Sequence, residues 1–149
     1  MFTGDELLAA GIDKSAITRR LRAKTLHRMY RNVYSIAPPA LLRPEARWLG
    51  AVLACGDGAV LSHCSAAVLW GLLEDRWSFV DVTTLRRGRK GTEGIRLHRT
   101  RRLEPADVVV VRELGEVLVG EVGGAVQPVR GQQAEDLGVL ALTPGVDPG

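Results

Sequence analysis

The sequence predicts an α+β protein, in which a short helical unit with a β-hairpin precedes a small mixed α/β unit. Three observations predict this order. Residues 11–36 combine a basic helical pattern with two β-prone runs, and residues 37–40 are rich in proline. Further helical patterns and β-prone runs then follow up to residue 112. We therefore expect domains at residues 1–37 and 38–112, with a Gly- and Val-rich tail at 113–149.

The first helix is predicted over Gly4–Ala10. Thr3 followed by Glu6 fits a capping box, in which the two side chains bond the free backbone N–H groups of the first turn. Phe2 and Leu7 are spaced as a hydrophobic staple across this helix start. Gly11 suits the position after the last helical turn, so the turn is expected at residues 11–13.

A basic helix follows, with Asp13 as its N-cap. Ile12 and Ile17 have the spacing of a staple, and Ile17 and Leu21 share one face by i, i+4 spacing. At 100° per residue, the polar side chains fall on the opposite face. We predict that this face is formed by Lys14, Ser15, Thr18, Arg19 and Arg22.

A hairpin comes directly after this helix. Leu26–Tyr30 and Val33–Ile36 are β-prone, and the connection Arg31-Asn32 supplies an Asn that tolerates positive φ. Helix, turn, basic helix and basic hairpin together predict a winged helix-turn-helix that binds DNA. The basic helix would enter the major groove, and the hairpin would lie along a neighbouring phosphate strand or minor groove through Arg28, Tyr30 and Arg31.

The second unit is predicted to begin with two helices. Pro44 opens the first, which places Trp48, Val52 and Cys55 on one face and ends at Gly56. Ser62 is expected to cap the second, which continues to Trp70 and ends at Gly71. This second helix is apolar almost all round, so we expect it to be the buried centre of the unit.

Three strands are predicted after these helices. They are Phe79–Thr84, a returning strand Ile95–Thr100, and Val108–Arg112. The connection between the first two strands is basic and contains Arg86, Arg87, Arg89 and Lys90, and the run after the second contains Arg99, Arg101 and Arg102. These residues form either a solvated face, a second phosphate contact, or a surface for an acidic partner.

Charge and composition limit the possible functions. Residues 1–112 contain 19 Lys and Arg against 11 Asp and Glu, whereas residues 113–149 contain one base and six acids. A basic body suits a nucleic-acid partner. No apolar run approaches the roughly 18 residues of a membrane span, and two cysteines are too few for a disulfide scaffold. We therefore expect a cytoplasmic protein without a membrane partner.

Several kinds of catalytic or metal site are disfavoured. Cys55, His63 and Cys64 lack a fourth ligand at zinc spacing, and buried cysteines are the simpler interpretation. Ser62, His63 and Asp81 are the residue types of a hydrolase triad, but no strained nucleophile elbow precedes Ser62. No Glu-x-Lys strand follows Asp81 to complete a magnesium nuclease. We expect no enzyme activity, no cofactor and no bound metal.

Four segments carry a resemblance to a known family. They are ITRRLRAKTLHRMYRNVYSI, ARWLGAVLACGDGAVLSHCSAAVLWGL, VDVT and RRGRKGTEGIRLHRTRRLEPADV. Residues 2–112 thereby resemble the actinobacterial AbiEi-type antitoxins or transcriptional regulators of type IV toxin–antitoxin systems. The resemblance implies a winged-helix domain that binds operator DNA and a second domain that opposes a nucleotidyltransferase-like toxin. Family members usually carry Gly at the position of Asn32 and Arg at that of Cys64.

The resemblance stops after Arg112. Family members continue with a Pro-containing strand and a long Leu- and Ala-rich helix, whereas residues 113–149 contain three prolines, many glycines and no aromatic residue. We expect an irregular or disordered tail in which only Val117–Val119 has the pattern of a brief strand. Our hypothesis is that the reading frame shifted near codon 112.

Two function classes follow from the sequence. The first is a DNA-binding transcriptional regulator, an autorepressor of its own antitoxin operon, with double-stranded operator DNA as partner and a homodimer as a possible form. The second is a protein-binding antitoxin or adaptor that neutralises a toxin through residues 86–102. A third outcome is a truncated copy without function.

Overall fold

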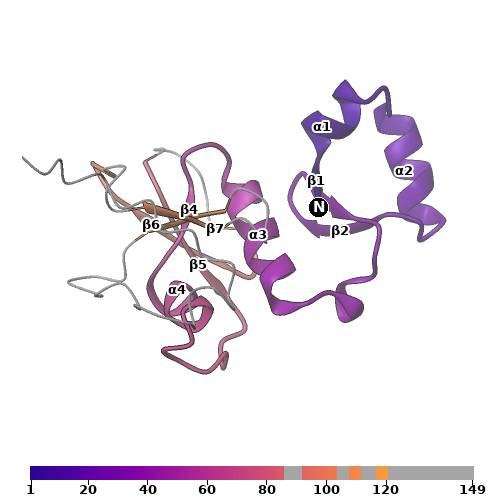
Figure 1. Ribbon diagram of the computed structural model, residues 1–149. Coiled ribbons are helices and arrows are strands. Elements are labelled where there is room, and N and C mark those ends of the chain that lie inside the picture. Colours follow the sequence, from indigo (N-terminus) through magenta and orange to yellow (C-terminus); the bar gives the residue numbers. More distant parts are fainter. Residues whose placement is uncertain (86–91, 104–107, 112–116, 121–149) are drawn as a thin grey trace, which may run out of the picture.

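In the computed structural model, the described part of the chain forms an α+β fold with four α-helices and two small sheets (Figure 1). The structure describes residues 1–85, 92–103, 108–111 and 117–120. The first sheet has the order β1-β3-β2, and the second has the order β6-β5-β4-β8-β7. Helix α3 (Pro44–Cys55) lies between the two sheets. The predicted fold class is therefore confirmed at this level.

The N-terminal helices form as the capping signals predict. The backbone N–H of Glu6 donates to Thr3 Oγ1 at 3.2 Å, and the N–H of Thr3 donates to Glu6 Oε2 at 2.6 Å, which completes the capping box of α1 (Gly4–Ala9). Gly11 has φ of +79°, a conformation open to glycine, and α2 (Lys14–Arg22) begins after the Asp13 cap. Phe2, one half of the predicted staple, is 38% exposed and belongs to strand β1, so the staple stays a prediction.

Strand β1 (Phe2–Thr3) is an element that the sequence analysis missed. It pairs antiparallel with β3 (Val33–Ser35), and β3 pairs antiparallel with β2 (His27–Tyr30). The predicted turn is confirmed, since Asn32 has φ of +61°. This turn docks on α1, where the backbone N–H of Gly4 donates to the Asn32 carbonyl at 2.9 Å. A Cβ at Gly4 would collide with the Asn32 side chain.

The larger core contains side chains from both sheets. Trp48, Ala51 and Val52 of α3 pack with β4 (Val60–Leu61) and β5 (Val80–Thr84), whose apolar side chains are fully buried. Tyr30 and Val33 of the hairpin belong to the same cluster, so this core extends across the predicted boundary at residue 37. A smaller core lies between the hairpin and the first two helices and contains Leu7, Ile17, Leu26 and Tyr34.

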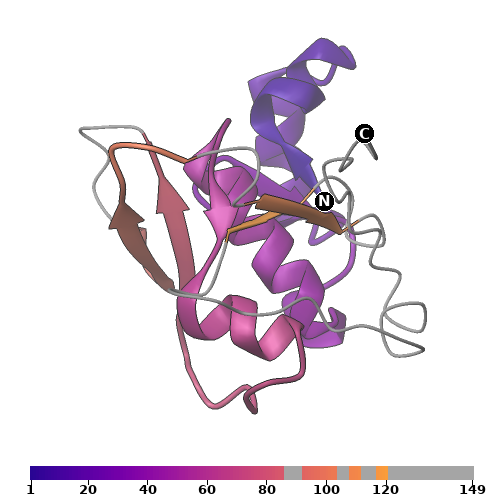
Figure 2. The ribbon, with the colours of Figure 1, turned by 60° about the vertical axis from the view of Figure 1, so that its left-hand side comes forward.

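Helix α4 (His63–Leu69) differs from the prediction in two respects, its burial and its N-cap. Its Ala66 and Ala67 are buried, but Val68, Leu69 and Trp70 are only half-buried, so β4, β5 and α3 form the centre of the core instead. Figure 2 shows α4 beside the sheet while α3 runs through the middle of the molecule. Ser62 occupies the N-cap position, but its side chain makes no capping hydrogen bond because it faces Thr83 and His63 instead.

Strand β6 (Ile95–Arg99) pairs parallel with β5, so the prediction of a returning strand is wrong. Nothing in the local sequence of the two strands indicates whether they pair parallel or antiparallel. The parallel register sets Asp81 opposite Arg96 and Thr83 opposite His98. Polar side chains of the two strands are thereby brought together on one face.

The C-terminal strands alter the expectation of an irregular tail. β7 (Val108–Val111) agrees with the predicted third strand, apart from Arg112, which lies outside the described residues. β8 (Val117–Gly120) pairs antiparallel with β7 and parallel with β4, so this stretch joins the sheet. Residues 113–116 and 121–149, where the rest of the predicted tail falls, lie outside the described residues.

The different burial of two tryptophans gives a test of this core. Trp48 is 5% exposed, so Trp48→Ala should lower the free energy of unfolding by about 3–5 kcal/mol. Trp70 is half-buried, so Trp70→Ala should cost about 2 kcal/mol. Urea denaturation followed by circular dichroism measures both. A larger loss for Trp70→Ala would contradict the placement of the core.

Tyr30 gives a second test, at alkaline pH. Burial raises the pKa of its phenol to about 12, with the Arg47 charge opposing this rise and Cys55 adding to it. The unfolded phenol ionises near pH 10. The contribution of the neutral Tyr30 phenol to stability is therefore complete below about pH 10. It is lost as the pH rises towards about 12, and the free energy of unfolding falls by about 2–3 kcal/mol. Tyr30→Phe should remove this part of the pH dependence in urea titrations, and an unchanged dependence would contradict the burial.

Candidate nucleic-acid interface

The position of α2 is set by its cap and by its apolar side. The backbone N–H of Ala16 donates to Asp13 Oδ1 at 2.6 Å, which confirms Asp13 as the cap. Ile17 is buried in the smaller core, where Ile12 and Leu21 pack against it, as the staple and the i, i+4 spacing predicted. The opposite face of the helix is consequently turned to solvent.

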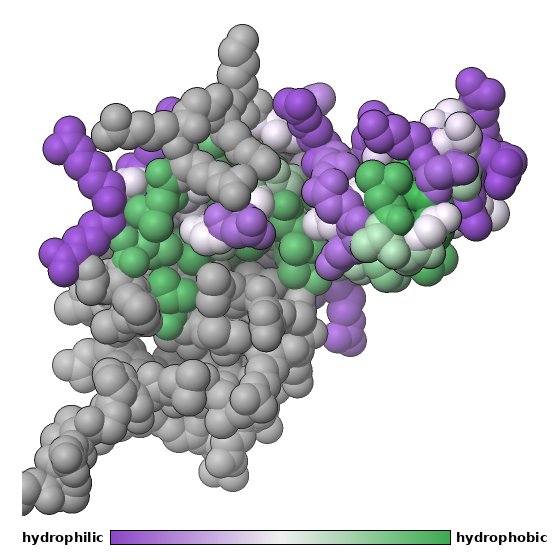
Figure 3. Space-filling model, turned by 90° about the horizontal axis from the view of Figure 1, so that it is seen from above, coloured by the Kyte–Doolittle hydropathy of each residue, from purple (hydrophilic) through white to green (hydrophobic). Residues whose placement is uncertain are grey.

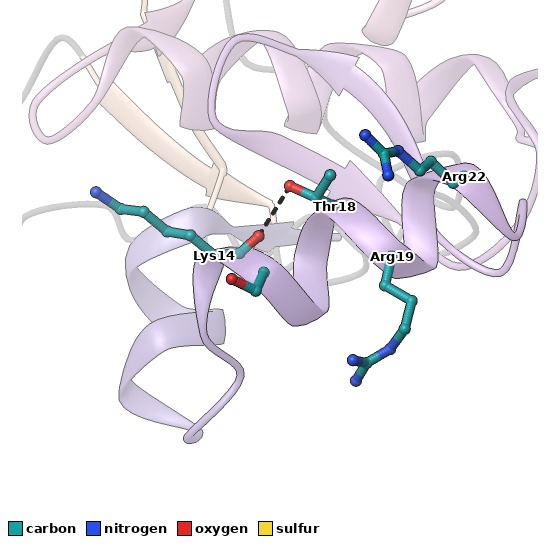
Figure 4. A pocket seen from close by; sticks show the side chains of 5 residues that line it. Lys14, Thr18, Arg19 and Arg22 are labelled. Atoms are coloured by element: carbon teal, nitrogen blue, oxygen red, sulfur yellow. Dashed lines mark hydrogen bonds between the residues drawn. The ribbon is translucent and has the colours of Figure 1, made fainter.

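The five polar residues predicted for this helix lie together on its exposed face. They line one open depression of about 510 Å³, shown in Figure 4: Lys14, Ser15, Thr18, Arg19 and Arg22. Thr18 Oγ1 donates to the Lys14 carbonyl at 2.9 Å, so this hydroxyl is held against its own helix. Lys14 and Arg19 extend away from the helix. The face combines long positively charged side chains with short hydrogen-bonding groups.

The charge of this surface is consistently positive. The sequence has no Asp or Glu from Lys14 to Pro44, and it has eight Lys and Arg there. Arg19 and Arg22 lie in the last turn of α2, where the helix dipole stabilises positive charge. Figure 3 shows hydrophilic side chains around much of the outer edge of this N-terminal part, at the right of the view. A polyanion is the ligand that such a surface attracts most strongly.

Two of the three residues predicted as contacts in the hairpin are exposed. Arg28 is exposed and stands over the Tyr34 ring, with its guanidinium carbon 5.9 Å from the ring centroid. Arg31 is exposed in the turn. Tyr30 is only 9% exposed and packs in the larger core, so its predicted role as a surface contact is corrected.

The second set of basic residues is separate from this surface. Arg99, Arg101 and Arg102 are exposed at the end of β6, which lies at the opposite end of the molecule from α2 (Figure 1). The other members of the predicted set lie outside the described residues: Arg86, Arg87, Arg89 and Lys90. The basic helix and the arginines after β6 are therefore two surfaces rather than one.

Within the ranges that the structure describes, no three His, Cys, Asp or Glu side chains are grouped so that they could hold a metal ion. No helix in those ranges has the length and apolar character needed to cross a membrane. Comparison of the sequence with protein-family models and with curated proteins finds no match.

The sequence analysis did not find a polar cluster at β5 and β6. Asp81, Arg96 and His98 meet there beside His63. The available signal was the period-2 alternation of polar residues in both strands, Asp81 with Thr83 and Arg96 with His98. The pairing of the two strands was needed to interpret that signal.

The Asp13 cap can be tested separately from its charge. Asp13→Ala should lower the free energy of unfolding by about 1 kcal/mol, because the Ala16 N–H loses its acceptor. Asp13→Ser removes the same charge and keeps a capping oxygen, so it should cost only a few tenths of this. Thermal denaturation measures the loss of stability in both variants, and equal losses would contradict a capping role.

Proposed function

We propose that residues 1–37 form a winged helix-turn-helix that binds double-stranded DNA, and that the protein is a transcriptional regulator. The observation that carries this proposal is the exposed face of α2. Five polar residues line it, and Ile17 on the other side anchors the helix in the smaller core. A helix held from below with its polar face free has the form needed to enter the major groove.

The residues of α2 suit two kinds of DNA contact. Arg19 can donate two hydrogen bonds to a guanine edge, and Ser15 and Thr18 are short enough to contact bases near the helix start. Lys14 and Arg22 stand at the two ends of the helix and suit phosphates on the groove walls. In this arrangement Arg19, Ser15 and Thr18 read the sequence, and the charges at the two ends fix the position of the helix.

The hairpin has the role of a stiff wing in this proposal. Arg28 and Arg31 are exposed, while Tyr30 and Val33 are packed in the larger core. The hairpin therefore carries two charges at a fixed orientation relative to α2. We assign these charges to the phosphates beside the groove that α2 enters.

The biological role that we propose is autorepression of an antitoxin operon. The resemblance of residues 2–112 to AbiEi-type antitoxins or transcriptional regulators supports it, with operator DNA as the partner. A protein-binding antitoxin or adaptor is the second candidate. It is favoured by Arg99, Arg101 and Arg102, which are exposed at the opposite end of the molecule from α2 and could contact an acidic partner while DNA is bound.

The salt dependence of DNA binding tests the proposed role of α2. With roughly five phosphate contacts, the log–log slope of affinity against salt should be near −4 to −5 for the gene's own upstream DNA. Arg19→Ala with Arg22→Ala should flatten this slope by about one unit for each phosphate that the variant no longer neutralises, and should weaken binding. Fluorescence anisotropy from about 50 to 200 mM salt measures the slope.

A matched control removes two exposed arginines elsewhere. Arg43→Ala with Arg76→Ala makes the same change of net charge outside residues 1–37. Its slope should stay near that of the unchanged protein. If this control flattens the slope as much as the α2 variant does, binding reflects net charge alone and the proposed interface is wrong.

A further inference from the structure

A buried carboxylate lies beneath two stacked histidines at the β5–β6 face. Asp81 is 1% exposed, and His98 Nε2 lies 2.7 Å from its Oδ1. The His63 ring stacks on the His98 ring with centroids 3.7 Å apart and planes inclined by 18°. Arg96 Nε lies 4.0 Å from the same Asp81 oxygen. Arg96 and His98 thus share the buried Asp81 carboxylate, and the His63 ring lies against His98.

Arg96, His98 and His63 are each fixed through one part of the side chain, while another part lies outside that contact. The Arg96 guanidinium carbon lies 3.5 Å from the centroid of the Phe79 ring, and the Arg96 side chain is 55% exposed. His98 is held at Nε2 by Asp81, which leaves its Nδ1 outside that contact. Side chains fixed in this way lose little conformational entropy when a ligand binds.

His63 is oriented by a chain of two hydroxyl groups. Thr83 Oγ1 donates to Ser62 Oγ at 2.8 Å, and Ser62 Oγ lies 3.0 Å from His63 Nδ1. The His63 ring is thereby held on its Nδ1 side, and its Nε2 lies outside this contact. Burial lowers the pKa of His63, and the neighbouring His98 and Arg96 lower it further against the effect of Asp81, so the neutral form is favoured.

If the only role of this cluster were to hold β5 and β6 together, it would carry two energetic costs. Asp81 Oδ2 is buried and has no hydrogen-bond partner among the described residues, which leaves part of the desolvation cost of the carboxylate unbalanced. His63 also has φ of +49°, a conformation that non-glycine residues adopt at an energetic cost. An apolar pair would join the strands without either cost, so the cluster calls for a functional explanation.

From these contacts we infer that Arg96, His98 and His63 bind a phosphate group. The guanidinium supplies two donors in a planar fork, and the stacked imidazoles supply the ring nitrogens that lie outside their contacts with Ser62 and Asp81. Asp81 acts as a positioning residue, because it orients the His98 ring. This site goes beyond the proposed DNA contact of α2, and it stands on the β5–β6 pair at the other end of the molecule.

Histidine NMR spectra in the presence of inorganic phosphate test the site directly. The protein has three histidines, and His27 in β2 serves as an internal control. At constant ionic strength, phosphate should shift the ring signals of His63 and His98 along one saturable curve and leave those of His27 unchanged. Shifts that do not saturate, or that include His27 equally, would overturn the inference.

Two variants separate a built site from a basic surface. Arg96→Gln should weaken phosphate binding by about tenfold, the loss expected for one charge-assisted hydrogen bond. Arg43→Gln removes the same charge outside this cluster and should change the affinity less than about twofold. Both side chains are exposed, so neither variant removes a core residue. Equal losses in the two variants would reduce the site to diffuse charge.

The source of the phosphate is decided by a second arm in the variant that carries Arg19→Ala and Arg22→Ala. A DNA duplex of unrelated sequence that shifts His63 and His98 in this variant identifies nucleic-acid phosphate as the ligand. Shifts with inorganic phosphate alone identify a free phosphate group. Absence of shifts with both ligands overturns the inference. This outcome does not count against the proposed DNA contact of α2, because the variant lacks Arg19 and Arg22.

Discussion

Burial of strand β3 on both faces is the constraint on which the rest of the structure depends. Successive side chains of a strand point to opposite faces, and β3 uses each face for a different core. Val33 packs with α3 and β5 in the larger core, whereas Tyr34 packs with α1 and α2 in the smaller one. A strand of three residues thereby joins two hydrophobic cores, and a shift of register by one residue would exchange them.

The burial of β3 on both faces also fixes the direction in which the basic face of α2 points. Tyr30 pairs with Val33 and packs against Gly50 of α3, where a Cβ would lie 3.2 Å from its ring. The hairpin is therefore held by the larger core, and α2 is held by the hairpin. Charges on α2 and in the turn consequently keep one mutual geometry, which a DNA-binding surface needs because every phosphate contact must be made at once.

The two basic surfaces differ in how their charges are held. On α2 the side chains of Lys14, Arg19 and Arg22 are exposed, which suits the proposed contact with base edges and phosphates. At β5 and β6 the groups are fixed by an aromatic ring, a buried carboxylate and a hydroxyl chain. Fixed donors favour a small ligand of defined geometry over a long polyanion, so the two ends of the molecule suit different partners.

The sequence by itself determined the elements whose causes are local. The capping box at Thr3, the Asp13 cap, the Asn32 turn and the Pro44–Gly56 helix follow from contacts within a few residues. The exposed face of α2 follows from helical periodicity in the same way. Only the tertiary structure decided which side chains are central: Tyr30 became a core residue, Trp70 stayed half-buried, and the parallel pairing of β5 with β6 brought Asp81 to His98. These outcomes depend on strand pairing between distant segments, and no local spacing encodes the direction in which two strands pair.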